Sequence, residues 1–165
     1  MVEPRSADEG VLATLSRAKA LIEVSDFDSA ILQFSQLLDH DLDGPLRGEV
    51  LTNLGAALCL SARGRRDAAA VSQLNQARDL LTAAIACRPR QHAPAAWATT
   101  RANLAVVHVA RYQASGNRDD LLAAHLALDG TEQALREAGD VALHDWVQAI
   151  RDQLTELGER RASRR

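Results

Sequence analysis

The feature that most constrains this chain is an internal repeat with a period of fifty residues. The segment LTNLGAALCLSARG at 51–64 returns in altered form within WATTRANLAVVHVARYQASGN at 97–117, so that Asn53-Leu54 corresponds to Asn103-Leu104. Both copies carry apolar residues at helical spacing. Self-similarity at a fixed period is typical of proteins that stack helical units, because each unit leaves an apolar face that its neighbour covers. The repeat therefore predicts stacked helical hairpins.

Helical periodicity extends along almost the whole chain. Hydrophobic residues make up 47% of the sequence and aromatic residues only 3%, so Ala, Leu and Val dominate, and Ala and Leu favour helices. We expect about seven helices, at 7–24, from an N-cap at Ser25 or Asp26 to Leu38, at 46–62, 67–87, 95–114, 118–138 with a weak point at Gly130, and 141–157. Together they predict one domain at 7–157, between a flexible N-terminus at 1–6 and a basic, disordered tail at 158–165.

The hairpins resemble the tetratricopeptide repeat (TPR), a unit of about 34 residues with Leu-Gly in its first helix and Pro at its end. The first unit spans Val11–Pro45, and the second carries Leu54-Gly55 and ends at Pro89. The third carries Leu104-Ala105, with Gly139 in place of the final Pro. The packing positions of the second helices are Phe27, Ala30 and Phe34, then Ala77 and Ala84, then Ala127 and Ala134.

The second and third units are longer than the family's. Gly55 and Ala77 are 22 residues apart, as are Ala105 and Ala127, where the family has about 12. The resemblance implies an all-α, right-handed TPR-like solenoid of antiparallel hairpins, closed by a capping helix at 141–157 in which Trp146 is a packing anchor. A plain helical bundle is the alternative.

The resemblance also implies a concave groove lined by the first helix of each hairpin. The residues that it places on this partner-binding surface are Lys19, Glu49, Asn53, Thr99, Asn103 and Val106. The bases that some family members use to hold a terminal carboxylate are absent, since Leu15, Thr99 and Asn103 stand at their positions. Two alternatives stay open: Asn53 and Asn103 hydrogen-bond to an adjacent helix, or the groove is filled by the chain's own last helix or by another subunit.

No nucleophile elbow, phosphate-binding loop or metal-binding motif occurs in the sequence. We therefore expect a non-catalytic adaptor that holds a peptide or amphipathic helix of another protein, without a cofactor or metal. His108 and His125 belong to the two helices of one hairpin but lack an obvious third ligand. The alternatives are a homo-oligomer joined through the open first hairpin at Leu12, Leu15 and Ile22, and a helical-bundle enzyme or small-molecule binder.

Charge and cysteine content bound the partners and the compartment. The net charge of −3 provides no global attraction for nucleic acid, and the short basic clusters at 63–67 and 160–165 are interpreted as solvated helix ends. No apolar leader and no run of 18 apolar residues is visible, so neither secretion nor a membrane partner is expected. Cys59 and Cys87 show no secreted spacing, which predicts a reducing cytoplasm.

Overall fold

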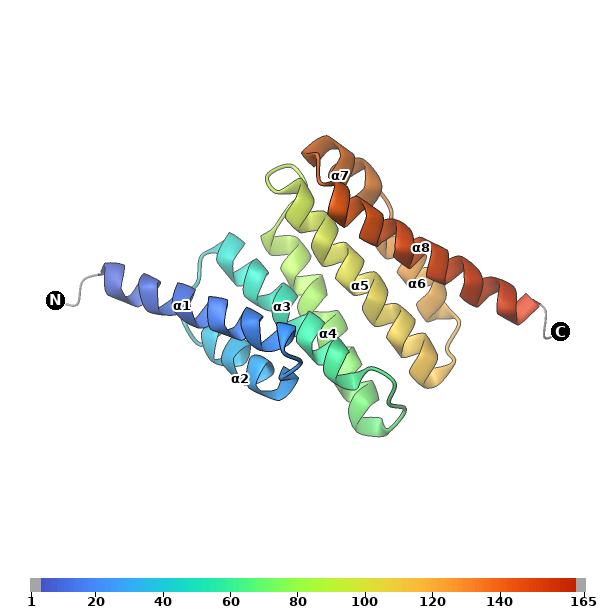
Figure 1. Ribbon diagram of the computed structural model, residues 1–165, viewed down its shortest axis with the longest axis horizontal. Helices are drawn as coiled ribbons and strands as arrows, with labels where there is room; N and C mark the ends of the chain where they lie inside the picture. The colour runs from blue at the N-terminus through green and yellow to red at the C-terminus, as the bar shows by residue number, and fades with distance from the viewer. Residues whose placement is uncertain (1–3, 163–165) are drawn as a thin grey trace.

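The computed structural model describes residues 4–162, which form α-helices joined by short loops (Figure 1). Within this range there are eight helices and no strand: α1 (Pro4–Glu23), α2 (Phe27–Leu37), α3 (Gly44–Ala62), α4 (Ala68–Cys87), α5 (Pro94–Ser115), α6 (Asp119–Ala127), α7 (Thr131–Ala138) and α8 (Val141–Ala162). The all-α prediction is confirmed. The helix predicted at 118–138 is divided into α6 and α7.

The two ends of the domain differ from the prediction. Residues 4–6 belong to α1 and residues 158–162 to α8, where a flexible N-terminus and a disordered tail were predicted. In α8 the helix continues because Gly158 alone does not break it, and Arg160 forms an i,i+4 ion pair with Glu156 at 3.5 Å. The remaining residues of those segments, 1–3 and 163–165, lie outside the described part of the chain.

The helices pack in chain order, and the first helices of successive hairpins also touch. Each of α1 to α5 packs on the next helix along the chain, α5 packs on both α6 and α7, and α7 packs on α8. In addition α1 contacts α3, α3 contacts α5, and α5 contacts α8. In Figure 1, α3, α5 and α8 lie toward the viewer, with α4 and α6 behind them. The copies of the fifty-residue repeat thus occupy neighbouring helices, α3 and α5.

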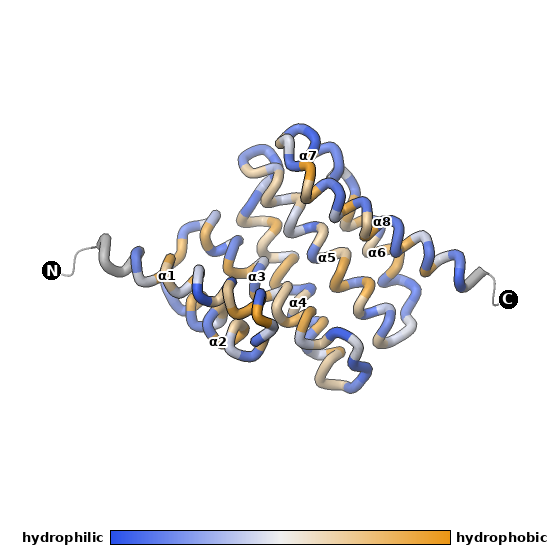
Figure 2. Tube along the Cα trace, in the orientation of Figure 1, coloured by the Kyte–Doolittle hydropathy of each residue, from blue (hydrophilic) through white to orange (hydrophobic). Residues whose placement is uncertain are grey.

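Two apolar clusters form the core, and α5 joins them. The first lies among α1 to α4 and includes Phe34, Leu74 and Leu81, all of which are fully buried. The second lies among α5 to α8, and Leu104 and Val106 of α5 pack against both clusters. Hydrophilic residues concentrate in the loops that precede and follow α5 along the chain (Figure 2). Helices α3 and α5 approach closely: the buried hydroxyl oxygens of Thr52 on α3 and Thr100 on α5 lie 2.9 Å apart.

Aspartate residues set the starts of three helices. Asp26, Asp43 and Asp67 are the N-caps of α2, α3 and α4, and each side chain accepts a hydrogen bond from a backbone N–H in the first turn. The predicted N-cap at Ser25 or Asp26 is therefore Asp26. Pro45 lies in the first turn of α3, where its missing N–H leaves no hydrogen bond unmade.

Two arginines from other helices stabilise the break between α6 and α7. Gly130 adopts a positive φ of 77° there, a conformation that glycine reaches without strain. Arg101 of α5 donates to the carbonyls of Ala127 at 2.8 Å and Leu126 at 2.6 Å, and Arg151 of α8 donates to that of Leu128 at 3.1 Å. These carbonyls lie at the C-terminal end of α6, where the regular helical hydrogen bonds end and carbonyl oxygens can accept further donors. Cations near a helix C-terminus also interact favourably with its dipole. The division of the predicted helix therefore depends on residues distant in sequence.

Candidate binding groove

A pocket of about 240 Å³ lies in the layer that contains α3, α5 and α8. Its lining residues are Ala56, Cys59, Leu60 and Arg63 at the C-terminal end of α3, Asn103 and Val106 on α5, and Trp146 on α8. Helix α5 contacts both α3 and α8, whereas α3 and α8 do not contact each other. The pocket is therefore a groove whose floor is α5 and whose walls are α3 and α8.

The groove continues along one face of α3. Residues three or four positions apart share a helix face, so the pocket residues of α3 extend a stripe that begins at the other end of the helix. Its side chains are half-buried except for that of Arg63, which is exposed. The stripe consists of Leu46, Glu49, Asn53, Ala56, Leu60 and Arg63. It spans about 26 Å at the helical rise of about 1.5 Å per residue. At its N-terminal end, Leu46 and Glu49 line a second pocket of about 430 Å³ together with Leu12 of α1.

The two ends of this stripe differ in charge. Glu49 forms an ion pair with Lys19 of α1. Arg63, which is the C-cap of α3 and is exposed, has no ion-pair partner within the described residues. Burial raises the pKa of the Cys59 thiol to about 11, and the nearby charge of Arg63 acts against this shift. The stripe is thus neutralised at one end and positive at the other.

The six residues predicted for the binding surface occupy different parts of this face. Asn103 and Val106 line the pocket. Glu49 lies at the far end of the stripe and is held by Lys19. Asn53 lies on the stripe between the two pockets, and Thr99 lies one turn before Asn103 on α5.

The two repeat-related asparagines make the same local hydrogen bond. Asn53 donates from Nδ2 to the carbonyl of Glu49 at 2.9 Å, and Asn103 donates to that of Thr99 at 3.0 Å. The bond runs to the preceding turn of the same helix, so the alternative that these amides bond to an adjacent helix is wrong. Both side chains are half-buried, and each bond leaves an amide oxygen on the groove face that can accept a hydrogen bond.

The pocket residues Leu60 and Arg63 are not among the six residues predicted for the binding surface. They extend the spacing of Glu49, Asn53 and Ala56 by one and two further turns, and this spacing is the signal that could have identified them. Trp146 was predicted as a packing anchor, and it packs against the second core cluster. It also contributes to the wall of the pocket.

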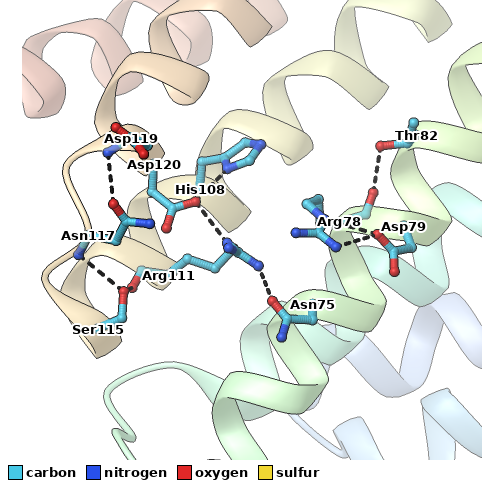
Figure 3. Close-up of polar contacts among 10 residues, drawn as sticks. All are labelled: Asn75, Arg78, Asp79, Thr82, His108, Arg111, Ser115, Asn117, Asp119 and Asp120. Atoms are coloured by element: carbon cyan, nitrogen blue, oxygen red, sulfur yellow. Dashed lines mark hydrogen bonds and ion pairs between the residues drawn. The ribbon is translucent and has the colours of Figure 1, made fainter.

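A buried charge cluster joins α4, α5 and α6 away from the groove (Figure 3). The Asp120 side chain is only 5% exposed, and its Oδ1 lies 2.9 Å from His108 Nδ1 and accepts from Arg111 Nε at 2.8 Å. Arg111 also donates to Asn75 of α4. The second oxygen of Asp120 is buried and has no hydrogen-bond partner among residues 4–162. The cluster links three helices, and the sequence analysis did not identify it.

The histidines of this hairpin do not form a shared site. His108 is held by Asp120, whereas His125 is exposed on α6. Within the described residues, no group of three or more His, Cys, Asp or Glu side chains could hold a metal ion. The partner that the structure records for His108 is Asp120.

Comparisons with known proteins add no identification. None of the helices in residues 4–162 combines the length and the apolar character needed to span a bilayer. No protein-family model, no curated protein and no solved structure gives a significant match to this chain.

Proposed function

We propose that this chain is a non-catalytic interaction module that binds a segment of another protein in the groove between α3 and α8. The observation that carries the proposal is the pocket, which combines apolar side chains, the amide of Asn103 and the charge of Arg63 in one opening. Arg63 forms no ion pair within residues 4–162. Its volume of about 240 Å³ is below the range of about 300–1,000 Å³ that is typical of small-molecule sites. A pocket of this size suits one or two side chains of a peptide.

The stripe on α3 supports a peptide as the occupant. Its length of about 26 Å matches about eight residues of an extended chain or a helix of several turns. The amides of Asn53 and Asn103 lie along this path with an oxygen available to accept a hydrogen bond. Main-chain N–H groups of an extended peptide would be their natural donors.

The architecture that we propose for this function is a TPR-like, right-handed solenoid. Its support is the contact of α1 with α3, α3 with α5 and α5 with α8, because a solenoid stacks equivalent helices in this order. The compartment that we propose is a reducing cytoplasm, because Cys59 and Cys87 are both free thiols.

Selection from a random peptide library displayed on phage, with the full chain as bait, tests the proposal. Ala56 is half-buried in the pocket wall, so Ala56→Phe places a ring in the pocket, whereas Ala83→Phe places the same ring on an exposed position of α4. We expect the selected peptides to bind the parent chain and Ala83→Phe in fluorescence anisotropy and to lose binding to Ala56→Phe. Circular dichroism must show equal helicity in all three proteins.

Two results would contradict the proposal. One is a selection that enriches no peptide above an unrelated bait of equal charge. The other is a set of peptides that bind Ala56→Phe as tightly as the parent chain, because such peptides occupy another surface.

A second candidate function is self-association through the first hairpin. Leu12 of α1 and Leu32 of α2 are 54% and 59% exposed, and large exposed apolar side chains are common at interfaces between subunits. Of the other residues predicted for this face, Leu15 is buried and Ile22 is half-buried. Light scattering over a range of concentrations tests this candidate, and we expect Leu12→Glu to abolish any dimer. A mass that stays monomeric at the highest concentration would exclude it.

A further inference from the structure

We infer that the partner segment places a large apolar side chain in the pocket and an Asp or Glu carboxylate against Arg63. This inference rests on the proposed function and specifies the chemistry of the partner. The pocket accounts for the apolar part, because Ala56, Leu60, Val106 and Trp146 expose carbon to it. The charge around the pocket accounts for the acidic part.

Arg63 forms no ion pair within residues 4–162 and lines the pocket, whereas Arg66, which is also without an ion pair there, does not line it. Arg65 binds Asp67 through two hydrogen bonds of 3.0 Å, and Arg111 binds the buried Asp120. No Asp or Glu lines the pocket at which Arg63 lies. A guanidinium presents a planar set of donors that fits a carboxylate in a bidentate arrangement, so the free side chain at the mouth of the pocket favours an acidic ligand.

The positive charge of Arg63 also reaches the interior of the pocket. The charge acts on the Cys59 thiol, which lines the same opening and whose pKa it lowers against the effect of burial. At the other end of the stripe, the charge of Lys19 is already neutralised by Glu49. At the pocket between α3, α5 and α8, discrimination by charge therefore depends on Arg63, the one charged residue in its lining.

The geometry favours a side-chain carboxylate over the terminal carboxylate of a peptide. Terminal carboxylates are held by several donors, commonly a group of backbone N–H groups. Arg63 lies where α3 ends, and a helix C-terminus presents carbonyl oxygens instead of N–H groups. A single Asp or Glu side chain needs only the guanidinium.

The peptides selected from the phage library are the probe for this inference. We expect the enriched sequences to contain an acidic residue beside a large apolar residue. Arg63→Glu should weaken a selected peptide about tenfold or more, because a charge-assisted hydrogen bond is lost. The matched control is Arg66→Glu, since Arg66 is exposed in the same loop but does not line the pocket, and it should change the affinity less than about twofold. Replacing the acid of the peptide by Lys should restore binding to Arg63→Glu.

The outcomes separate this inference from the proposed function. Peptides that are blocked by Ala56→Phe but carry no acid, or that respond equally to Arg63→Glu and Arg66→Glu, would overturn the inference and leave the groove as a binding site. Peptides that ignore Ala56→Phe would overturn both. If amidation of the peptide's C-terminus removes binding, the carboxylate is the terminal one, and the assignment to a side chain is wrong.

Discussion

Removing the carboxylate of Asp120 should destabilise the protein more than removing any exposed charge. The Asp120 side chain is 5% exposed and accepts from His108 and from Arg111, which is itself 19% exposed. Asp120→Ala leaves the half-buried Arg111 with Asn75 as its remaining partner among the residues that the structure describes. Breaking a buried ion pair by deleting one member costs about 3–5 kcal/mol. Because Arg111 retains one partner and some contact with water, we expect a loss of about 3 kcal/mol, or about 6–12 °C in Tm.

Urea unfolding followed by far-UV circular dichroism measures this change. The control is Asp119→Ala, because Asp119 is the neighbouring carboxylate in the first turn of α6 but is exposed. This control should cost less than about 1 kcal/mol, which is the usual effect of an acid near a helix N-terminus. Combining Asp120→Ala with Arg111→Ala should cost less than the sum of the single changes, since the second substitution removes the unpaired cation.

Two results would refute this reasoning. Equal decreases in the free energy of unfolding for Asp120→Ala and Asp119→Ala would show that the buried cluster does not contribute to stability. Strict additivity of Asp120→Ala and Arg111→Ala would show that these two side chains do not interact.

Three further predictions follow from close packing, ion pairing and burial. Gly55→Ala should lower the free energy of unfolding in urea by about 1–3 kcal/mol, because the added Cβ would lie 2.7 Å from the Leu81 side chain on α4. The control Gly158→Ala, with no atom within 4 Å of the added Cβ, should stabilise the protein by about 0.5 kcal/mol. Equal effects of the two substitutions would contradict the close packing of α3 on α4 at Gly55. The hydrogen bond from Arg151 holds the pKa of Glu132 below its ordinary value of 4.5, so this ion pair stabilises the fold above pH 4.5 and the stabilisation is lost as the pH falls through the lowered pKa. Glu132→Gln should therefore be less stable than the parent chain at neutral pH, with a difference that shrinks in acid, and a difference independent of pH would refute the assignment. Burial raises the pKa of the Cys59 thiol to about 11, so at mildly alkaline pH a thiol reagent should leave Cys59 unmodified in the native protein and modify it in denaturant; rapid native modification of Cys59, located by mass spectrometry, would contradict its burial.

The fold was predictable because its determinants are local. The Asn-Leu pair at 53–54 and 103–104 and the helical spacing around it were sufficient to place α3 and α5 as neighbouring, equivalent helices. The break at Gly130 was visible only as a weak point. Its completion depends on Arg101 and Arg151, which reach the end of α6 from α5 and α8, and a sequence pattern does not show such distant contacts.

The candidate site was predictable only in part. Asn103 and Val106 line the pocket, but Arg63 was interpreted as part of a solvated basic cluster. The role that we propose for it depends on its having no acidic partner within residues 4–162, which only the packing of α3, α5 and α8 shows. The cluster at Asp120 was missed because it depends on how α4, α5 and α6 are each oriented about their own axes. The sequence does not specify these orientations. The spacing of His108 and Arg111, which share a face of α5, was the one signal for it.

The most direct test of the central claim is an NMR titration of the isotope-labelled full chain with a selected peptide. The claim predicts that shift changes concentrate on the groove, at the backbone amides of Ala56, Leu60 and Val106, the side-chain amide of Asn103 and the indole N–H of Trp146. Shift changes that concentrate instead on the exposed faces of α4 and α6, with the groove signals unmoved, would contradict it.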